Sequence, residues 1–594
     1  MGRFARSHLT RMLREAQAAC GESMATGIPI DEVTGMRAAR SARQRAVARE
    51  AVEAYNDSVC RVLERGARED YVAKAAAMEN VKRLGRREFL AGAGKTAFVA
   101  ALAATMGETL FRAQRASATQ KVRVAIVGGG LAGLRCAHSL WTKYGWTSTV
   151  YEANSTVGGR CETNRNYFLN GDIAEMHGEF ISSEHLSVLN LISAFNLTLE
   201  DYNAHPAGTI DTYWLNGARY TQAALNADWQ GWAWKLFNDA AKAAPWPQFY
   251  NTYNAQGKAW DSISVPQWIN QYVNGGTTGQ FGGLCLQDVI DEYGGDPADQ
   301  SALNLTMILG YNDSAGGRGF QPTTSPVLAG TDERWHIVGG NDQLVTTMVN
   351  QLPAGTIKTG QVLTALKANA DGTFTLTFTS GATTSQVTVD SVVLTPSFKV
   401  LRNVDLTASG LSARKMNAIN NLGMGTNGKI IMQFNGHPWQ ADGYTGTTYQ
   451  DNGFLSSGWE MINRQFAGPT GIWTAFPGGN YTPQILTTYG LTQHEGIPPA
   501  TLITDALNQL EPVLPGVTKA YNGRAWYHFG SNDPYVQGGY PYWRVGQYTA
   551  FSGYEDVLEG KIHFAGDFNP NVQGFMEGAV SGAERAAGEV HPSG

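Results

Sequence analysis

An apolar run with no polar face opens the most regular part of the chain. Val122, Val124 and Ile126 alternate on one face, and Ala125 and Val127 keep the opposite face apolar. A short strand that is apolar on both faces is typical of a sheet covered on both sides. Glycines follow the run directly, and a helical pattern begins after them. The pattern therefore predicts a buried strand, a tight turn and a helix.

The glycines of this turn have a spacing with chemical meaning. Gly128, Gly130 and Gly133 fit G-x-G-x-x-G, and Leu131 and Ala132 lie between the second and third glycines. Glycines at these positions let the backbone turn tightly and approach a pyrophosphate, which then lies at the positive end of the helix. The alternative is a glycine-rich turn that binds nothing.

An acidic residue at the right distance argues against that alternative. Glu152 ends the next apolar strand, 148–152, and follows Gly133 by 19 residues. A carboxylate at the end of the second strand accepts hydrogen bonds from the ribose hydroxyls of the adenosine half of a dinucleotide. The strand, the turn, the helix and the acid together predict a dinucleotide site.

A second glycine pair indicates which dinucleotide is bound. Gly158, Gly159 and Arg160 follow Glu152 closely. NAD dehydrogenases have no need of glycines there, whereas the longer body of a flavin needs close backbone approach and a nearby cation. Glu152 with this Gly-Gly-Arg resembles the flavin amine oxidases, that is, monoamine oxidases, polyamine oxidases and L-amino acid oxidases.

The C-terminal part resembles the closing flavin motif of the same family. A strand from Ile562 leads to Gly566 and Asp567, and a helix is expected to begin near Phe575 and Met576. The strand brings the acid to the ribityl or phosphate region, and the amides of the helix N-terminus can stabilise negative charge on a reduced flavin ring. The two motifs must meet in one site.

The resemblance implies an α/β fold with a Rossmann-like FAD-binding domain, of the glutathione-reductase type, and a discontinuous α+β substrate domain. The FAD-binding segments are expected at 119–200, 331–400 and 536–594, and the substrate segments at 201–330 and 401–535. Within the first segment, Glu179 and Phe180 resemble the strand that passes the isoalloxazine. The backbone at Val362 resembles the position that holds the adenine. Residues 358–362 and 391–396 have the composition of strands.

The resemblance also suggests catalytic positions. Lys429 opens an apolar strand and resembles the family lysine that holds a water near flavin N5. Tyr548 and Phe575 match the two walls of an aromatic cage that steers a neutral amine, and Trp543 and Arg544 stand beside that cage. The alternatives are a surface lysine and core aromatics. Gln547 stands where monoamine oxidases carry the cysteine linked to flavin, so FAD is expected to be noncovalent.

The substrate class is less defined than the cofactor. An L-amino acid oxidase needs a cation for the substrate carboxylate, and around Phe180 no arginine is present. We therefore expect oxidation of a primary amine or polyamine, with molecular oxygen as acceptor. An L-amino acid oxidase using Arg544 is the alternative, since a charge-assisted pair can decide such selectivity. Desaturases, porphyrin oxidases and a noncatalytic flavin protein are further alternatives.

Composition adds bounds to this interpretation. The 594 residues carry a net charge of −6, are 43% hydrophobic and contain 69 glycines, which suits a large globular enzyme. The region after residue 118 is acidic, which disfavours nucleic-acid binding. The sequence contains no uninterrupted run of 18 apolar residues, so no membrane span is predicted. The cysteines have no spacing of a metal cluster or a disulfide framework. The oligomeric state stays open, with a homodimer as one arrangement.

The basic leader resembles an export signal. Arg86 and Arg87 precede a weakly apolar stretch and the small-x-small pattern 116–118. A twin-arginine-type signal peptide is therefore expected at 81–118, with export to the periplasm or the medium. A cytoplasmic protein is the alternative. Residues 1–80 are either a helical extension or a mis-assigned translation start.

Overall fold

The computed structural model describes residues 122–310, 331–461 and 468–591. Every described residue belongs to one compact unit, Gln114–Gly594. The expected extension at 1–80 and the expected signal peptide at 81–118 lie outside the described residues.

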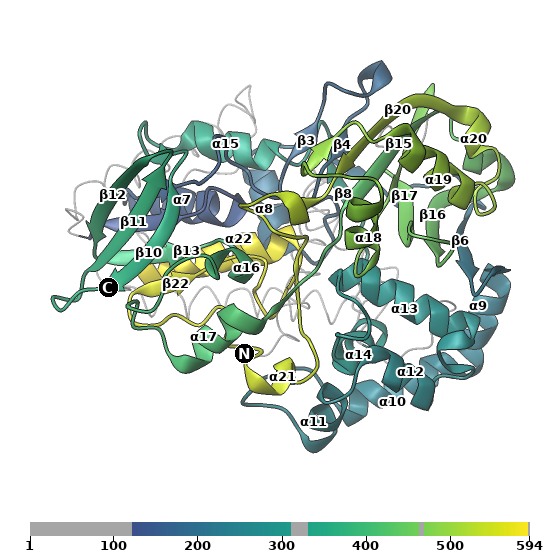
Figure 1. Cartoon of the computed structure of the whole chain (residues 1–594), viewed down its shortest axis with the longest axis horizontal. Helices are drawn as coiled ribbons and strands as arrows, with labels where there is room; N and C mark the ends of the chain where they lie inside the picture. Colours follow the sequence, from purple (N-terminus) through teal and green to yellow (C-terminus); the bar gives the residue numbers. More distant parts are fainter. Residues whose placement is uncertain (1–121, 311–330, 462–467, 592–594) are drawn as a thin grey trace, which may run out of the picture. The chain divides into compact units, whose positions relative to one another are not determined.

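Five short strands form a parallel sheet in the spatial order β22-β13-β1-β2-β9 (Figure 1). Their bounds are β1 (Val124–Val127), β2 (Thr149–Tyr151), β9 (Ile357–Lys358), β13 (Ser391–Leu394) and β22 (Ile562–Phe564). All four residues of the central strand β1 are buried, as its sequence pattern predicts. Strands from three distant parts of the chain thus meet in one sheet, and the predicted α/β class is confirmed.

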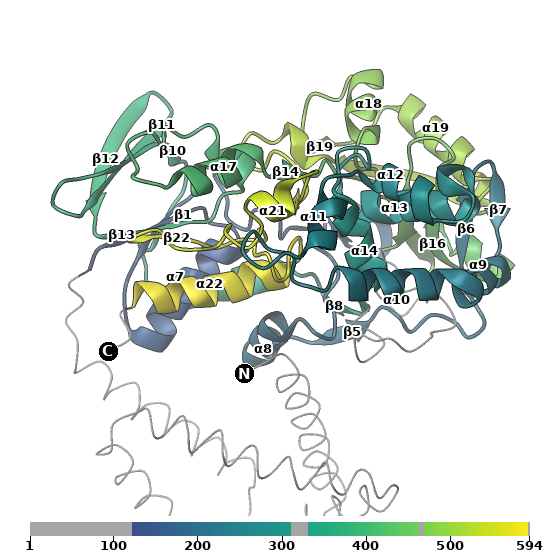
Figure 2. The same cartoon turned by 90° about the horizontal axis from the view of Figure 1, so that it is seen from below.

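Two long helices cover one face of this sheet (Figure 2). They are α7 (Leu131–Tyr144) and α22 (Met576–Val590), and they pack against each other. Ile126 of β1 belongs to the same hydrophobic cluster as Ala583 and Ala587 of α22. The small alanine side chains let the helix lie close to the sheet.

A three-stranded antiparallel meander covers the opposite face (Figure 2). It consists of β10 (Val362–Ala368), β11 (Phe374–Ser380) and β12 (Thr383–Val389). Tyr151 of β2 stacks on Phe378 of β11 with ring centroids 4.4 Å apart. The parallel sheet is therefore covered by helices on one side and by strands on the other.

The strand expected over 358–362 is interrupted. β9 ends at Lys358 and β10 begins at Val362, because Gly360 has a φ of +65° and turns the chain away from the parallel sheet. The N–H of Gly360 donates to the carbonyl of Asn154 at 2.9 Å. This turn keeps Val362 beside the end of β2.

A larger sheet of eight strands has the order β19-β20-β15-β18-β17-β16-β6-β7. Its strands are β6 (Ile210–Leu215), β7 (Ala218–Tyr220), β15 (Lys429–Asn435), β16 (Tyr444–Gln450), β17 (Ser457–Glu460), β18 (Thr470–Ala475), β19 (Glu495–Gly496) and β20 (Tyr521–His528). The pair β6–β16 is parallel and the other pairs are antiparallel. The first six residues of β15 are buried, so this strand lies in the centre of the sheet.

A layer of helices from 222–310 packs together on their apolar faces (Figure 1). They are α9 (Gln222–Asp228), a π-helical turn (Trp229–Ala233), α10 (Trp234–Ala243), α11 (Ala255–Asp261), α12 (Val265–Tyr272), α13 (Gln280–Tyr293) and α14 (Ala302–Gly310). Their core includes the fully buried Trp268 and Phe237.

The remaining elements are short. The helices are α8 (Leu186–Ala194), α15 (Gln343–Gln351), α16 (Phe398–Leu401), α17 (Ala413–Asn421), α18 (Tyr481–Thr488), α19 (Ala500–Leu510), α20 (Val517–Ala520) and α21 (Gln547–Ala550). The strand pairs are β3 (Thr163–Asn164) with β4 (Ala174–Glu175), β5 (Leu199–Asp201) with β8 (Trp335–Ile337), and β14 (Gly423–Met424) with β21 (Pro541–Tyr542). In the described ranges, no helix has the length and apolar character needed to cross a membrane.

Candidate active site

A cavity of about 1930 Å³ is lined by residues from both large sheets. The carboxyl ends of β1 and β2 open onto it, where ligands bind in parallel α/β sheets. One part, lined by Gly128, Gly130, Glu152, Arg160 and Asp567, is called the cradle. The other part, lined by Asp291, Glu292, Glu333, Trp459, Phe476 and Tyr540, is called the chamber.

The first glycine turn adopts the conformation that its spacing predicts. Gly128 has a φ of +97°, and a Cβ on Gly133 would lie 1.9 Å from the carbonyl oxygen of Gly128. Glu152 accepts hydrogen bonds from the N–H of Gly129 at 2.5 Å and of Asn154 at 2.6 Å. Burial raises the pKa of the Glu152 carboxyl. Gly133 thus sets the close strand–helix contact, while Glu152 is fixed at the end of β2.

Two helix N-termini point into the cradle without a side-chain cap. The N-cap residue of α7 is Gly130, which has no side chain, and that of α22 is Phe575, whose side chain has no acceptor for a capping hydrogen bond. Leu131, Ala132 and Met576, in the first turns of these helices, line the cavity. Uncapped N-termini with their partial positive charge favour a phosphate or another anion.

The two sequence motifs meet at an ion pair. Arg160 Nη1 and Nη2 donate to the carboxylate of Asp567 at 2.5 and 2.8 Å, and Nη1 also donates to the carbonyl of Gly539 at 2.5 Å. Gly158, two residues before Arg160, forms a bridge with Gly130 of the first turn. Glycine turns, arginine and acid therefore belong to one cradle.

Nearly all residues expected to bind the cofactor line the cavity. They are Gly128, Gly130, Leu131, Ala132, Glu152, Gly158, Gly159, Arg160, Glu179, Phe180, Val362, Gly566, Asp567, Phe575 and Met576. Gly133 does not line it, because it packs α7 against β1.

Lys429 opens β15 and lies at the junction of cradle and chamber with only 1% of its surface exposed. Its Nζ donates to Glu179 Oε2 at 2.6 Å and to the carbonyls of Glu175 at 2.9 Å and His177 at 3.1 Å. An ammonium has three N–H donors, so all of them have protein acceptors. The other oxygen of Glu179 accepts from Trp459 Nε1 at 3.0 Å.

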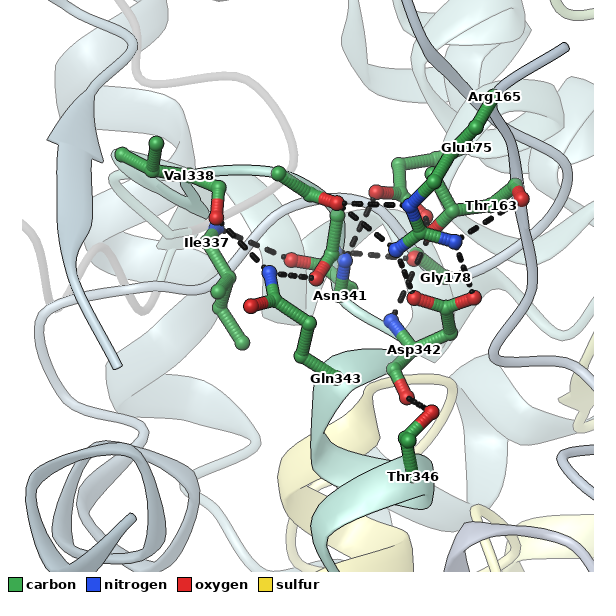
Figure 3. Close-up of polar contacts among 12 residues, drawn as sticks. Thr163, Arg165, Glu175, Gly178, Ile337, Val338, Asn341, Asp342, Gln343 and Thr346 are labelled. Atoms are coloured by element: carbon green, nitrogen blue, oxygen red, sulfur yellow. Dashed lines mark hydrogen bonds and ion pairs between the residues drawn. The ribbon is translucent and has the colours of Figure 1, made fainter. Parts of the chain in front are cut away.

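Asn341 holds the segment that carries these acceptors (Figure 3). Its side-chain amide donates to the carbonyls of Glu179 at 2.6 Å and Gly178 at 3.2 Å, and its backbone N–H donates to Glu175 Oε1 at 2.9 Å. The second oxygen of Glu175 accepts from Thr163 at 2.9 Å. Burial raises the pKa of the Glu175 carboxyl to about 8. The segment 175–179 is therefore fixed from both sides.

An ion pair supports the loop that carries Asn341 (Figure 3). Arg165 pairs with both carboxylate oxygens of Asp342, the residue before α15, and donates to the carbonyl of Gly339 at 3.0 and 2.7 Å. Sequence reasoning did not single out Asn341, Arg165 or Asp342, since none belongs to a recognisable motif.

Tyr548, expected as one wall of the aromatic cage, does not line the cavity. Tyr548 is fully buried among the helices, its hydroxyl donates to Asn304 at 2.9 Å, and its ring lies 4.6 Å from that of Trp543. Trp543 in turn donates to Glu555 at 2.8 Å. Neither aromatic lines the cavity. The two residues form part of the hydrophobic core, because the chain turns into the helical layer after β21.

Arg544 and Gln547 lie away from the cavity as well. Arg544 is exposed and donates to the Tyr542 hydroxyl at 3.3 Å, so it does not provide the carboxylate anchor of the amino-acid alternative. Gln547 starts α21, where its side chain accepts from the N–H of Arg544 at 2.9 Å. Its identity therefore says nothing about how flavin is attached.

The chamber has a different aromatic wall. Trp459 lies 5.3 Å from Phe180 and 5.1 Å from Phe476, and Phe476 lies 6.4 Å from Tyr540, all measured between ring centroids. Phe575 also lines the cavity, as expected. The signal that could have located Tyr540 is the glycine pair before it, Gly538-Gly539, whereas Trp459 and Phe476 have no sequence signature.

Three acidic side chains line this chamber. Asp291 and Glu292 lie at the end of α13, and Glu333 has a φ of +38°. Burial raises the pKa of Asp291 to about 6 and holds the pKa values of Glu292 and Glu333 well above their usual range. The side chains keep partial exposure because they face the cavity.

The cations around the cavity are already paired. The described lining residues include one arginine, Arg160, and one lysine, Lys429. Each of the two is bound to an acidic side chain. Burial lowers the pKa of His205 in the chamber to about 4, so this ring is neutral at pH 7. The described part of the chamber therefore offers acidic partners to a cation, and its described lining residues include no unpaired lysine or arginine for an anionic group.

These features define the class of protein. A parallel sheet, glycine turns that leave room for close approach and an acid at the end of β2 form a dinucleotide cradle. A Cβ on Gly130 would stand 3.8 Å from the Gly158 carbonyl and 3.9 Å from the Gly159 Cα, in the gap between the two turns. A cradle that continues into an aromatic, acidic chamber belongs to an enzyme that brings a redox dinucleotide to an organic substrate.

Comparison with known proteins identifies the family. The family model for flavin-containing amine oxidoreductases matches residues 131–591, and the chain belongs to this family. It is thus an enzyme with a flavin cofactor that acts on CH–NH2 groups, and the family resemblance of the sequence is confirmed. The residues of the cradle fit the FAD of family members.

Individual relatives are distant and span several substrates. An L-amino-acid oxidase of Echis ocellatus is 22% identical over 479 residues, which cover 79% of this chain and 88% of that protein. The flavin-containing amine oxidase A of Sus scrofa is 24% identical over 486 residues, covering 80% and 86%. The structure of cyclohexylamine oxidase from Brevibacterium oxydans has a TM-score of 0.65 at 18% identity, covering 79% of this chain and 99% of that one.

Proposed function

We propose that this chain is an FAD-dependent amine oxidase whose substrate is a primary amine or polyamine, with molecular oxygen as acceptor. The amine R–CH2–NH2 loses two electrons and two protons to become the imine R–CH=NH. Oxygen takes both electrons and protons to become H2O2, and water hydrolyses the imine to R–CHO and NH3. Bound FAD supplies the redox chemistry by relaying the electron pair.

The observation that carries this proposal is the chamber that adjoins the cradle. Its aromatic wall can enclose an alkyl chain, and Asp291, Glu292 and Glu333 can ionise to pair with an ammonium group. An amine is cationic in solution at neutral pH and must lose a proton before its carbon is oxidised. Carboxylates at this place can bind the cation and accept its proton.

The same residues speak against an amino acid as the substrate. A substrate carboxylate needs a cationic partner, and both cations among the described lining residues are bound to acids. Phe180 lies where an L-amino acid oxidase would need an arginine for the substrate carboxylate, and it packs against Tyr202 and Trp459.

The L-amino acid oxidase remains the second candidate because several relatives carry that name. It would give a 2-oxo acid, NH3 and H2O2. A desaturase or porphyrin-type oxidase is the third, and it would leave amines untouched. The three candidates differ in the compound that reduces the bound flavin.

The test is catalase-sensitive H2O2 release by the full-length chain loaded with FAD. The panel contains monoamines, diamines, polyamines and L-amino acids. We expect peroxide from amines and none from amino acids. Peroxide from amino acids alone would refute the proposed substrate, and flavin that no member of the panel reduces under anaerobic conditions would refute amine oxidation.

We also propose that FAD is held without a covalent bond. The cradle offers contacts along the dinucleotide. A covalent link would need a reactive side chain, and Cys161 is the one cysteine among the described lining residues. Its thiol is buried in an apolar cluster, and burial raises its pKa well above the usual range, which disfavours a reactive thiolate. Acid precipitation should release the flavin into the supernatant, whereas flavin that stays with the pellet would contradict this.

Export by a twin-arginine route is a separate proposal that rests on sequence alone. Arg86 and Arg87 precede an apolar stretch and a small-x-small pattern. Replacing both arginines by lysine should keep the protein in the cytoplasm, while the native sequence is expected outside it. Equal distribution of both proteins after cell fractionation would reject the proposal.

A further inference from the structure

A buried ion pair stands at the junction of cradle and chamber. Lys429 Nζ lies 2.6 Å from Glu179 Oε2, and the two side chains are only 1% and 3% exposed. Both residues line the cavity. A charge so deeply enclosed is costly unless a partner neutralises it, and this pair does so.

The lysine of this pair has no N–H left for a water. Its three donors go to Glu179, Glu175 and His177, within one segment of the chain. The expected role, a lysine that holds a water near the flavin, requires a free donor. The contacts around Lys429 therefore point to another role.

The segment that carries Glu179 borders the cradle. A Cβ on Gly178 would lie 3.2 Å from the carbonyl oxygen of Arg160 and 3.2 Å from Met576 Cγ. Gly178 therefore separates the second glycine turn from the start of α22. Glu179 follows directly, so its carboxylate lies where the cradle passes into the chamber.

The other groups around the pair add little charge. His336 Nε2 lies 3.7 Å from Glu179 Oε1, and burial lowers the pKa of His336 to about 4. Burial lowers the pKa of His528, the strand partner of Lys429, to about 3 and also lowers that of His177. These rings are neutral at pH 7.

Two carboxyl groups complete the surroundings of the pair. Burial raises the pKa of Glu175 to about 8, so this carboxyl is mainly protonated at pH 7, and burial also raises the pKa of Glu333 well above its usual range. Trp459 adds a neutral donor to Glu179. Lys429 and Glu179 thus form the charged pair at this point.

We propose that Glu179 is a positioning residue that binds Lys429 in a neutral pair and thereby sets the charge beside bound flavin. Without Glu179, the ammonium would face the cofactor uncompensated. Without Lys429, the Glu179 carboxylate would face the cofactor uncompensated. The inference depends on flavin binding and not on which amine is oxidised.

The test is the midpoint potential of the bound flavin in the full-length holoenzyme. Reduction adds negative charge to a flavin, so a nearby positive charge raises the potential and a negative charge lowers it. We expect Glu179→Gln to raise the potential and Lys429→Met to lower it. The double variant should return close to the wild type, because both charges are then absent.

Two further variants serve as controls. Asp201→Asn removes the acid of a partly exposed pair with Arg334 that does not line the cavity, and it should leave the potential unchanged. Lys429→Arg keeps the charge and should keep the potential near that of the wild type. If Glu179→Gln binds no flavin, the difference in flavin potential between Lys429→Met and Lys429→Arg shows whether the charge at this position matters.

Other outcomes overturn the inference. Equal potentials in Lys429→Met, Lys429→Arg and the wild type would show that the pair sets no charge at the flavin. Shifts of the same sign in Glu179→Gln and Lys429→Met would indicate a general distortion. If the potentials follow the expected pattern while no amine is oxidised, the proposed substrate fails and this inference stands.

Discussion

The cradle and the chamber share one cavity but are built by different means. The cradle relies on backbone geometry, with glycines at close contacts, helix N-termini without caps and one acid at a strand end. The chamber relies on side chains, with Trp459, Phe476 and Tyr540 forming a wall next to three carboxylates. We therefore expect the cradle to recognise the shared cofactor and the chamber to recognise the particular substrate.

This difference has a physical origin. A pyrophosphate is the same in every dinucleotide, and the turn that approaches it allows few residue types. An alkyl or aryl group can be enclosed by many combinations of apolar side chains, provided that volume and shape fit. Changes in the cradle should therefore abolish cofactor binding, whereas changes in the chamber should shift selectivity.

The largest effect is expected in the cradle, from Gly133→Val. Any Cβ at this position would meet the Gly128 carbonyl oxygen at 1.9 Å, and that backbone cannot move without opening the contact between α7 and β1. We expect loss of FAD binding and a destabilisation of about 3 kcal/mol or more. Flavin fluorescence and thermal unfolding measure both.

Gly588→Ala is the matched control for this substitution. Gly588 lies in α22, and the nearest atom to its added Cβ would be the Tyr144 hydroxyl at 3.7 Å. FAD binding should be unchanged, with a gain of up to about 1 kcal/mol from helix propensity. Normal flavin binding by Gly133→Val would remove the distinction between cradle and chamber.

A smaller effect, confined to the substrate, is expected from Glu292→Gln and Glu333→Gln in the chamber. Each keeps the volume of the side chain and removes a carboxyl group that can ionise to pair with the ammonium of the substrate, so KM for an amine should rise about tenfold per substitution, which corresponds to about 1.4 kcal/mol. FAD affinity should stay the same. Steady-state kinetics and flavin titration separate the two quantities.

Asp239→Asn controls for the loss of a negative charge in general, since Asp239 is exposed on α10 and pairs with Lys235. Unchanged KM in both chamber variants would contradict the role of the carboxylates. A loss of FAD binding in either variant would show that chamber and cradle are not separable.

The two tyrosines 540 and 548 provide a sharper comparison. Tyr540 lines the chamber, so Tyr540→Ala should lower kcat/KM about tenfold or more by removing part of the wall. Tyr548→Phe removes the donor to buried Asn304 and should cost about 1–2 kcal/mol in stability with kcat/KM nearly unchanged. The reverse pattern would restore Tyr548 as a cage residue.

The smallest effect concerns Glu175, beside the cradle. Its pKa is about 8 in the folded protein against an ordinary value of 4.5, so the folded state binds the proton more tightly. Stability should therefore fall as pH rises from about 4.5 to about 8, and Glu175→Gln should reduce this slope. The expected difference is of the order of 1 kcal/mol or more in urea unfolding between pH 5 and pH 8.

Asp390→Asn is the control for this pH dependence. Asp390 pairs with Arg123, which lowers the pKa of the carboxyl to about 2. That group stays ionised in both states over the tested range, so the slope should match the wild type. A Glu175→Gln slope equal to that of the wild type would contradict the raised pKa of Glu175.

Most of the cradle was predictable from sequence because its geometry is local. Gly128, Gly130 and Gly133 act within one turn, and Glu152 ends the next strand, so spacing alone locates them. The meeting of Arg160 and Asp567 in one site was expected once both motifs had been assigned to it. Their ion pair was not predicted and is a finding of the structure.

The chamber was not predictable because its residues come together only in the folded chain. Glu292 belongs to a helix that reads as an ordinary amphipathic element, and Glu333 has no motif around it. Tyr540 and Tyr548 lie in the same aromatic-rich stretch, and only the turn after β21 decides which one faces the cavity. The pair of Glu179 with Lys429 also depends on tertiary contacts.

The parallel sheet is built from strands that are far apart in the sequence, and this has a consequence for biosynthesis. β22 and α22 lie within residues 562–590, and they supply an edge strand, one covering helix and Asp567 of the cradle. A nascent chain that has emerged only as far as β20 has the first glycine turn and most of the chamber wall but lacks this closing part. We therefore expect a nascent chain that stops before residue 562 to retain its cofactor poorly, because Asp567 and the N-terminus of α22 are then missing from the cradle.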